Sequence, residues 1–455
     1  MVLQSKKRFA VTLLVNISRL VLAVVLIVSG FVKAVDPVGT MYKLQEYASV
    51  FSLDTLSNDW LLFFAIVQAA MEFLLGVFML TGIYRKVVPL FSMMMLLCFT
   101  PLSYYIMSNG SLDDCGCFGD AVELDNNTTF YKNLVLLFLS FLVFWKRRRF
   151  SLYISSKNRW LVVLFSFFYI SVLQGVSLSF LPVLDFRPYA EGNNLRELTQ
   201  GTLDEYAVYY LCEKDGVQQE FLQDNMPDSS WSVLSSRSEV VTEGKKPVIG
   251  DFSIIDWEYD YDIAEEILAD TGYVCLVVIE KMEEAAVSRI DKVNDLYDYC
   301  LENAVPFYAA TSSSDEEIEL WRKRTGAEYP ICWADESLLR RIIRANPGLL
   351  LLKDGVIVSK WNASDIPSVE EIADSPTKMP DKVDTLFDNV RGWRFWVNCF
   401  LWPLAFIALV DVFSGKAKRK KARAASEKGI QPVSSAAGSE VNDKSESGHY
   451  SNNDI

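Results

Sequence analysis

Six long apolar segments constrain the fold of this chain more than any other feature of its sequence. The first runs from about Phe9 to Val35, directly after the basic residues Lys6–Arg8. It is too long for the apolar core of a secretory signal peptide, and no small-residue cleavage site follows it. The other five are each close to the roughly 20 residues that an α-helix needs to cross a bilayer. They are Trp60–Leu80, Val87–Met107, Phe130–Trp145, Trp160–Leu181 and Trp393–Phe413. The sequence therefore predicts an α-helical membrane protein.

The lysines and arginines beside these segments predict their orientation, because such residues accumulate on the cytoplasmic side of a membrane. With six spans, four basic clusters fall on one side: Lys6–Arg8, Arg85–Lys86, Lys146–Arg149 and Lys416–Arg423. We therefore expect a multi-pass protein of a bacterial inner membrane with both termini in the cytoplasm. The loops 36–59 and 108–129 and the large segment 182–392 are then predicted to be periplasmic.

Composition narrows the classes of function. Hydrophobic residues make up 51% of the chain, yet the net charge is −14, so an acidic soluble part must accompany the apolar spans. The single histidine, His449, lies in a polar tail, which disfavours histidine-based catalysis and most zinc sites. Neither a glycine-rich phosphate loop nor a basic run interleaved with aromatic residues is present. We therefore expect lipid as a partner, and no nucleic acid.

A loop between the third and fourth spans carries two cysteines one glycine apart, in the order Cys115, Gly116, Cys117, Phe118, Gly119. In a helix or a strand, residues i and i+2 point away from each other, so only a turn brings the two sulfurs together. Gly116 supplies the positive φ that such a turn needs. A disulfide closed over so few atoms departs from relaxed geometry and is easily reduced. We predict that Cys115 and Cys117 are a catalytic redox pair and that the neighbouring loop residues support them.

Two other interpretations of this cysteine pair stay open. The pair could be a structural clasp that only stiffens the turn, or it could bind a metal ion. Metal binding is the weaker alternative because no histidine lies nearby and two sulfurs alone are an incomplete site. Asp113, Asp114 and Asp120 surround the thiols with negative charge, which disfavours the thiolate and suits a slow exchange partner.

Arg19 lies inside the first predicted span and Glu72 inside the second, with Gln68 one helical turn before Glu72. Charges inside a membrane are costly and mark a functional or a pairing site. One interpretation is an Arg19–Glu72 ion pair that locks two helices together, and the other is a role in proton or quinone handling. Lys33, near the outer end of the first span, is expected to extend its ammonium group to the interface.

The periplasmic segment is predicted to contain one small α/β domain from Val248 onward. Its apolar runs and helical stretches alternate in the order Tyr273–Ile279 (strand), 285–303 (helix), Pro306–Ala310 (strand), Asp315–Thr325 (helix), Leu349–Lys353 and Val356–Trp361 (strands). Asp354-Gly355 between the last two strands is a strong hairpin signal. Residues 183–247 are predicted to be a linker or a cap.

The first third of the chain resembles a known membrane family. Arg19–Lys33 with Asp36-Pro37 is similar to the first helix of the DoxX superfamily, and Glu72–Gly76 is similar to its second. Cys115–Gly119, followed by Lys132-Asn133-Leu134, resembles the MauE branch (methylamine utilisation protein E). The resemblance implies a four-helix membrane bundle linked to periplasmic disulfide chemistry, with quinone as a further expectation. Lys132 stands where many relatives carry arginine. Lysine keeps the positive charge of arginine but cannot form the two parallel hydrogen bonds of a guanidinium group.

The α/β segment resembles thioredoxin-like folds of the TlpA/peroxiredoxin type, on the order of its elements and on Asn346-Pro347 before the hairpin. The resemblance implies a cis peptide bond at Pro347. In that family, a Cys-x-x-Cys motif follows the strand that corresponds to Tyr273–Ile279. Residues 280–285 stand in this place here and include no cysteine, so we expect a degenerate domain that binds or presents something. The remaining periplasmic cysteines, which allow three pairings, are Cys212, Cys275, Cys300 and Cys332.

The predicted division is a DoxX/MauE-like membrane domain at 1–150, a fifth transmembrane helix within 151–182, a linker or cap at 183–247, a thioredoxin-like domain at 248–380, a sixth transmembrane helix at 393–413 and a disordered basic tail at 414–455. The predicted function is thiol–disulfide exchange with a periplasmic thioredoxin-like protein or a disulfide-containing client. The alternative is a non-enzymatic membrane scaffold or assembly factor. A transporter is disfavoured because the chain shows no inverted repeat and has few polar residues in its spans.

Overall fold

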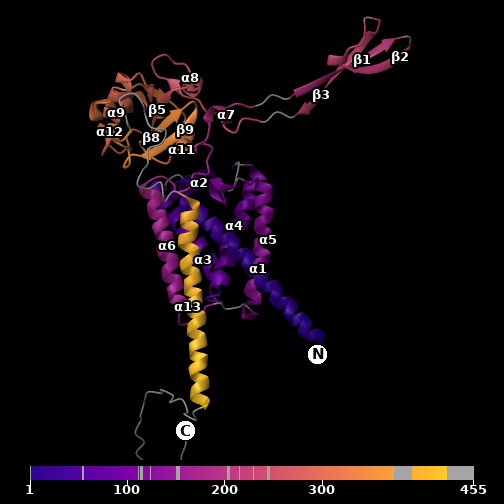
Figure 1. The fold of residues 1–455 in the computed structure, drawn as a ribbon, viewed down its shortest axis with the longest axis vertical. Coiled ribbons are helices and arrows are strands. Elements are labelled where there is room, and N and C mark those ends of the chain that lie inside the picture. The colour runs from indigo at the N-terminus through magenta and orange to yellow at the C-terminus, as the bar shows by residue number, and fades with distance from the viewer. Residues whose placement is uncertain are drawn as a thin grey trace, which may run out of the picture.

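A computed structural model of the chain describes residues 2–53, 56–110, 112, 116–122, 124–149, 154–201, 205–214, 216–228, 230–242, 246–372 and 392–427. Within these ranges, six helices are long and apolar enough to cross a membrane. They are α1 (Val2–Val35, apolar from Arg8), α3 (Asn58–Thr81), α4 (Val88–Asn109), α5 (Asn126–Trp145), α6 (Arg159–Ser179) and α13 (Trp393–Glu427, apolar to Phe413). The six predicted spans are thus confirmed to within a few residues at each end. Figure 1 shows the helices side by side, with a sheet-rich part at one end.

The membrane helices pack around two apolar cores. Helices α1, α3, α4 and α5 share the core formed by Leu22, Ala23, Met79, Val88, Leu96, Leu136 and Val143. A second core joins α3 to α6 and α13, where the rings of Tyr169 and Phe400 lie 5.1 Å apart and Phe73 contacts both. Large apolar side chains on the opposite faces, such as Phe138 and Phe406, are exposed, as is expected of surfaces that contact lipid tails.

Helices α1 and α3 run antiparallel and approach each other closely at two glycines. A Cβ placed on Gly30 would lie 2.3 Å from the backbone nitrogen of Phe73, and one on Gly76 would lie 2.7 Å from that of Ile27. Small residues of this kind allow two membrane helices to bring their backbones together. This approach fixes which side chains of α1 lie level with which side chains of α3.

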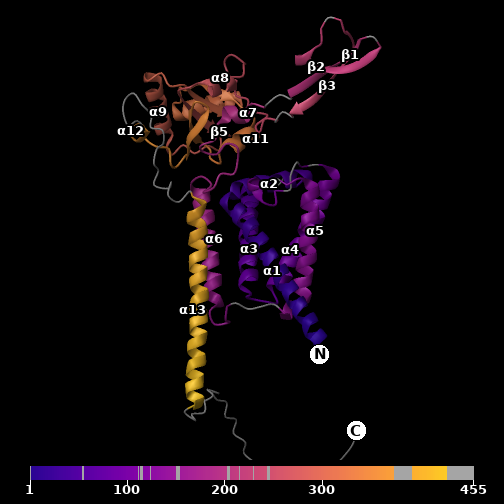
Figure 2. The same ribbon diagram turned by 45° about the vertical axis from the view of Figure 1, so that its right-hand side comes forward.

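A short helix, α2 (Pro37–Val50), follows α1 where the sequence suggested only a loop. Asp36 caps its N-terminus, because its Oδ1 atom accepts a hydrogen bond of 2.8 Å from the Gly39 N–H, and Pro37 occupies the first helical position. Met41 of α2 packs on the first turns of α3. Helix α2 therefore lies across the end of the membrane helices, below the α/β domain (Figure 2).

The α/β domain is built on a six-stranded sheet with the strand order β4-β7-β6-β5-β8-β9. The strands are β4 (Ile255–Asp256), β5 (Tyr273–Ile279), β6 (Phe307–Thr311), β7 (Ile331–Trp333), β8 (Gly348–Lys353) and β9 (Val356–Asn362). Strands β5, β6 and β7 are parallel, whereas β4, β8 and β9 pair antiparallel with their neighbours. The four strands expected from the sequence are confirmed, and β4 and β7 are additional.

Helices cover both faces of this sheet. They are α7 (Leu195–Thr199), α8 (Ala264–Ala269), α9 (Ile290–Glu302), α10 (Asp315–Thr325), α11 (Glu336–Ile342) and α12 (Val369–Ile372). One core holds the apolar residues of α9 and α10, and the other holds those of α7, α8 and α11. The expected helix at 285–303 begins only at Ile290, while α10 has its expected bounds. The Asn346-Pro347 peptide bond is cis, as predicted.

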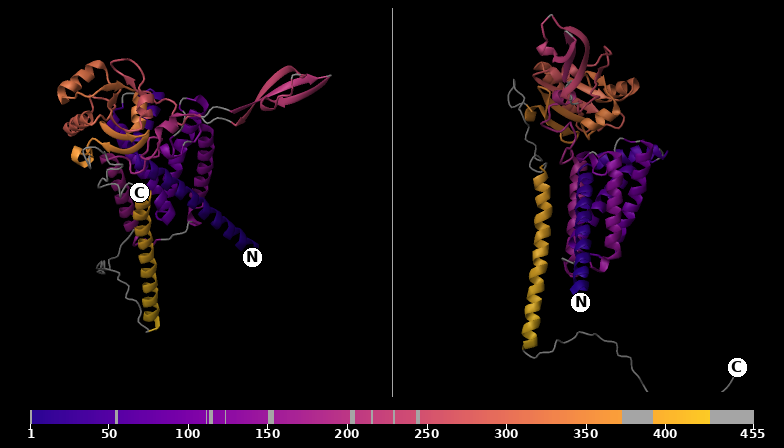
Figure 3. Two further views of the ribbon diagram at one scale, coloured as in Figure 1. Left: turned by 45° about the horizontal axis from the view of Figure 1, so that its top comes forward. Right: turned by 90° about the vertical axis from the view of Figure 1, so that its right-hand side faces the viewer.

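The chain between α6 and α7 also belongs to the α/β domain, although the sequence suggested a linker or cap there. Tyr189 and Leu195 lie in its core, and the Gly192 N–H donates to the Ile357 carbonyl at 2.8 Å. The chain then leaves the domain and forms a separate sheet of order β2-β1-β3, which projects away from the rest (Figure 3). Its strands are β1 (Glu205–Lys214), β2 (Val217–Leu222) and β3 (Ser232–Thr242).

Candidate functional site

The cysteine loop lies between α4 and α5, at the end of the membrane helices that faces the α/β domain. Cys115 lies outside the described residues. Gly116 has a φ of +58°, the left-handed conformation that the sequence predicted, and its carbonyl accepts a hydrogen bond of 3.1 Å from the Gly119 N–H. The chain therefore makes a tight turn at Cys117 and Phe118. A short 3-10 helix, η1 (Gly119–Ala121), follows.

A polar cluster inside the helices holds this turn from one side. The Ser29 hydroxyl of α1 lies 2.7 Å from the carbonyl oxygen of Cys117 and 2.6 Å from Oε2 of Glu72 in α3. The Lys33 ammonium donates to both carboxylate oxygens of Glu72, at 2.8 and 2.9 Å, and to the Ser29 hydroxyl at 3.0 Å. The Gln68 amide donates to Glu72 at 3.1 Å, as its position one helical turn earlier suggested. Ser29, Lys33 and Glu72 are all buried.

The partner of Glu72 is thus Lys33, and the expected Arg19–Glu72 pair is wrong. Arg19 is buried as well, but it precedes Ser29 by ten residues in α1, which corresponds to about 15 Å along the helix axis. The close approach of α1 and α3 places Ser29 and Lys33, rather than Arg19, level with Glu72. The expectation that Lys33 reaches the interface is also wrong, because its side chain is only 5% exposed.

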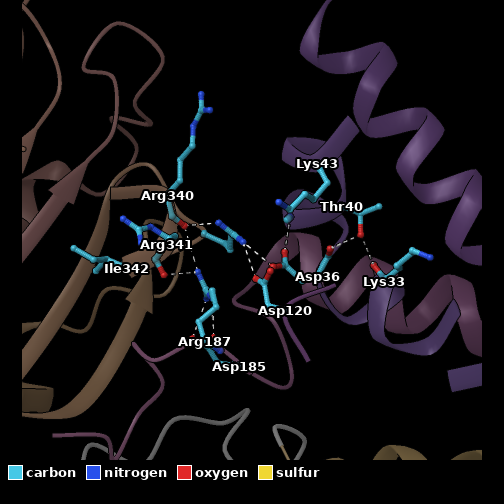
Figure 4. Close-up of polar contacts among 12 residues, drawn as sticks. Lys33, Asp36, Thr40, Lys43, Asp120, Asp185, Arg187, Arg340, Arg341 and Ile342 are labelled. Atoms are coloured by element: carbon cyan, nitrogen blue, oxygen red, sulfur yellow. Dashed lines mark hydrogen bonds and ion pairs between the residues drawn. The ribbon is translucent and has the colours of Figure 1, made fainter. Parts of the chain in front are cut away.

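A second polar cluster holds the turn from the side of the α/β domain (Figure 4). Arg344, which follows α11, donates from Nε to Asp36 at 2.9 Å and from Nη2 to Asp120 at 3.1 Å. Asp120 lies in η1, three residues after Cys117. The Arg344 side chain is 7% exposed, so this contact is largely removed from solvent. It connects the α/β domain to both the loop and the start of α2.

The two carboxyl groups around Arg344 differ in their pKa. Burial alone would raise the pKa of Asp36, but the guanidinium groups of Arg344 and Arg187 and the Gly39 N–H outweigh burial and hold this pKa below its usual value. Burial, with the neighbouring charge of Asp36, raises the pKa of Asp120 despite Arg344. Asp120, the residue nearer to the cysteines, is therefore the first of the two to take up a proton as the pH falls.

The chain directly after β5 also contacts the membrane part. Glu280, directly after β5, accepts hydrogen bonds from the Tyr42 hydroxyl of α2 at 3.1 Å and from Nε of Arg340 at 2.8 Å. The Arg340 guanidinium lies 4.4 Å from the centre of the Tyr42 ring, a cation–π arrangement. Glu280 and Arg340 of the α/β domain thus both contact Tyr42 of α2.

A third ionic cluster fixes the chain between α6 and the α/β domain. Asp185 accepts from Arg187 at 2.7 Å and from the buried Lys360 ammonium of β9 at 2.9 Å. Burial would raise the pKa of Asp185, but these two cations lower it well below its usual value. Burial lowers the pKa of Lys360 to about 8, against the attraction of Asp185. Figure 4 shows Asp185 and Arg187 of this cluster near Asp120.

A cavity of about 790 Å³ opens beside the loop, between α2 and α11. Its lining includes Tyr42, Lys43, Asp120, Arg341 and Arg344. The cavity is large enough for a short peptide segment or a small molecule. Asp120, three residues after Cys117, is the point at which this cavity reaches the loop.

Two further loop residues have defined contacts. The Lys132 ammonium of α5 lies 4.5 Å from the centre of the Phe118 ring, so the lysine that departs from the family pattern still binds the loop. Gly119 has a φ of +52°, and a Cβ placed on it would lie 3.4 Å from Val32. Cys117 itself is half-buried. Sequence reasoning missed Ser29, Asp36 and Arg344, although a serine one turn before Lys33 on α1 was a usable signal.

The cysteines of the α/β domain lie apart from this loop, in the cores of the sheet. The Sγ atoms of Cys275 in β5 and Cys300 in α9 are 3.7 Å apart, and both residues are buried. The hydrogen bond from Cys300, together with burial, raises the pKa of Cys275. Cys332 is buried on the opposite face of the sheet, and burial raises its pKa to about 12. Cys212 belongs to the projecting sheet, so of the open pairings the structure brings together only Cys275 with Cys300 among the described residues.

Comparison with known proteins agrees with the membrane part of this description. Residues 11–146 match the model of a family described as "Methylamine utilisation protein MauE". Residues 206–243, the projecting sheet, match a "Domain of unknown function (DUF8463)". The chain has no match among curated proteins. The MauE match spans α1 to α5 and includes the cysteine loop, Ser29, Lys33 and Glu72, so this membrane segment of the chain is similar to the MauE family.

Proposed function

We propose that this chain is a redox-associated membrane protein that supports thiol–disulfide exchange through Cys115 and Cys117. The partner is a separate thioredoxin-like protein or a disulfide-containing client, which the MauE similarity links to methylamine metabolism. The anchoring of the loop carries the proposal: the Cys117 carbonyl is bound by Ser29 inside the helices, and Asp120 is bound by Arg344 of the α/β domain. A turn fixed from two sides would hold Cys117 in a defined place for a partner.

The α/β domain, in this proposal, is a thioredoxin-like domain that docks rather than reacts. The arrangement of parallel β5, β6 and β7 beside the antiparallel hairpin β8–β9 supports the thioredoxin-like assignment. Glu280 supports the docking role, because it binds Tyr42 and Arg340 where the family carries thiols. The cavity beside Asp120 is the proposed approach for a partner's thiol or disulfide segment.

The proposed chemistry is an exchange that conserves electrons. The thiolate of one loop cysteine attacks a sulfur of the partner disulfide, which forms a mixed disulfide and releases a partner thiolate. The second loop cysteine then attacks the mixed disulfide. The loop is oxidised to a disulfide and the partner is reduced to a dithiol, with two electrons and two protons transferred. The reverse reaction oxidises a client, and the relative reduction potentials decide the direction.

The proposed location is the inner membrane of a bacterium, with the loop and the α/β domain in the periplasm and the termini in the cytoplasm. The contact of Arg149 with the Arg8 carbonyl, at 3.1 Å, supports this orientation because it brings two basic clusters to one end of the helices. We propose that the first five helices form a DoxX-like bundle with one added helix. Coupling to quinone gains no support from Lys33 and Glu72, which bind each other and Ser29, and no step is derived through it.

Cysteine trapping tests the proposed exchange. We expect the full chain to show reversible oxidation at the 115–117 peptide by differential alkylation and mass spectrometry. Cys117→Ser or Cys115→Ser alone should accumulate a mixed disulfide with its partner, whereas Cys98→Ser, in the lipid-exposed part of α4, should behave as the unaltered chain. An unaltered chain whose two loop thiols are never oxidised would contradict the proposal.

The scaffold alternative predicts a different result from the same variants. The contact of Arg344 with Asp36 and the cation–π contact of Arg340 with Tyr42 favour a structural role, because they would hold the α/β domain in place without any redox step. If the Cys115→Ser/Cys117→Ser double variant retains full function in cells, the chain is an assembly factor.

A further inference from the structure

The Ser29 hydroxyl links the turn to the ion pair inside the helices. It has one proton to donate, and two oxygen atoms lie within hydrogen-bond distance: the Cys117 carbonyl at 2.7 Å and Oε2 of Glu72 at 2.6 Å. Lys33 approaches the same hydroxyl as a donor, at 3.0 Å. Whether the Ser29 hydroxyl donates to the Cys117 carbonyl or to Glu72 therefore depends on how fully the hydrogen bonds from Lys33 satisfy the Glu72 carboxylate.

A purely structural role does not account for the energetic cost of the buried Lys33–Glu72 pair. Two charges buried among membrane helices cost several kcal/mol to desolvate, and an apolar pair of similar size would pack as well. Lys33 reaches both oxygens of Glu72, and Gln68 satisfies Oε1 further. With the carboxylate satisfied in this way, the Ser29 proton is left for the Cys117 carbonyl.

We propose that Ser29 is a positioning residue for Cys117 and that Lys33 and Glu72 control it by holding the hydroxyl toward the loop. This inference rests on the proposed redox role of the loop and deepens it. The two sulfurs meet only in a turn, so a contact that holds the turn stabilises the disulfide over the dithiol. Loss of the contact therefore makes the loop disulfide easier to reduce.

The reduction potential of the loop tests this inference. The full chain, in detergent or nanodiscs, is equilibrated with glutathione redox buffers and the 115–117 peptide is scored by differential alkylation. A hydrogen bond contributes about 1 kcal/mol, so we expect Ser29→Ala to shift the equilibrium about fivefold toward the dithiol. This shift corresponds to a potential about 20 mV less negative for a two-electron couple. Ser29→Thr, which keeps the hydroxyl, should restore the unaltered value.

The ion pair is tested by three further variants. Lys33→Met should shift the potential in the same direction as Ser29→Ala, because the unsatisfied Glu72 carboxylate then takes the Ser29 proton. Glu72→Gln removes this competing carboxylate and should not shift the potential in that direction. The control is Asp411→Asn, which removes a carboxylate that binds Ser155 and Asn158 in another part of the membrane helices. This control should leave the potential unchanged. If an ion-pair variant fails to fold, the comparison of Ser29→Ala with Ser29→Thr still decides, because both leave the pair in place.

The outcomes separate the inference from the proposed function. If the loop disulfide has the same reduction potential in the unaltered chain and in Ser29→Ala, the positioning role of Ser29 is wrong while the redox role of the loop stands. If Ser29→Thr shifts as far as Ser29→Ala, a change of packing rather than the hydroxyl explains the effect, and the inference is again wrong. If the unaltered loop does not titrate, both fall together.

Discussion

Arg344 and Asp120 form an ion pair of 3.1 Å that joins the α/β domain to the residue three positions after Cys117. The same guanidinium binds Asp36, where α1 ends and α2 begins. One buried side chain therefore connects three segments that are far apart in the sequence. The position of the α/β domain and the conformation of the cysteine loop are coupled through it.

Removal of Arg344 should release the α/β domain from the membrane part. Arg344→Ala leaves the half-buried Asp36 and Asp120 without their cation, a change that costs on the order of 1–3 kcal/mol. We expect faster amide hydrogen exchange in α2 and η1, measured by mass spectrometry on the full chain. Arg322→Ala, on the exposed face of α10, is the matched control and should leave this exchange unchanged. Equal protection of α2 in both variants would contradict the coupling.

The close approach of α1 and α3 should be sensitive to side-chain size. Leucine at Gly76 would meet the backbone of Ile27, so Gly76→Leu should destabilise the helix pair by about 1–3 kcal/mol. Gly175→Leu, on α6, is the control because a Cβ there meets nothing within 4 Å. Thermal unfolding in detergent measures the difference between the two. Similar unfolding temperatures for both variants would show that the helices do not approach as described.

The Asp185 cluster predicts how stability changes in acid. The pKa of Asp185 is lowered in the folded chain, so its contribution is present above the unfolded value of about 4 and is lost as the pH falls below it. We expect Asp185→Asn to be less stable than the unaltered chain at pH 7. Below about pH 4, the free energy of unfolding of this variant should fall less steeply with pH than that of the unaltered chain. Urea unfolding at several pH values measures this decline. Asp354→Asn, in an exposed ion pair with Arg196, should keep the full decline.

The buried cysteines of the α/β domain should be unreactive in the folded chain. Cys275 and Cys300 are shielded in the core, and the raised pKa of Cys275 keeps its thiolate scarce. Alkylation at pH 8 should modify them only after denaturation, as peptide mass spectrometry can show. Rapid labelling of either residue under native conditions would mean that the core between β5 and α9 opens readily.

Sequence reasoning located the membrane helices because length and hydropathy alone determine which segments can cross a bilayer. It also found β5, α10 and the β8–β9 hairpin, since each has a local signal: an apolar run, a capping serine or an Asp-Gly turn. Helix α2 was missed because its residues are neither strongly apolar nor clearly periodic, and its position depends on contacts with α3 and the α/β domain.

The partner of Glu72 could not be read from the sequence for a different reason. Arg19 and Lys33 are both cations in α1, and only the level at which α1 meets α3 distinguishes them. That level is set by Gly30 and Gly76, whose role appears when the two backbones are seen together. Arg344 was missed because its two acidic partners lie more than two hundred residues away in the chain.

The projecting sheet of β1, β2 and β3 leaves the α/β domain and returns to it at adjacent points, because the Ile249 N–H donates to the Leu198 carbonyl at 3.0 Å. The sheet is therefore an insertion in the α/β domain. The two ends of the inserted segment meet at one hydrogen bond, and the core of the domain is formed by residues outside the insertion. A chain that lost residues 201–246 and gained a short turn would keep the loop, the ion pairs and the docking contacts.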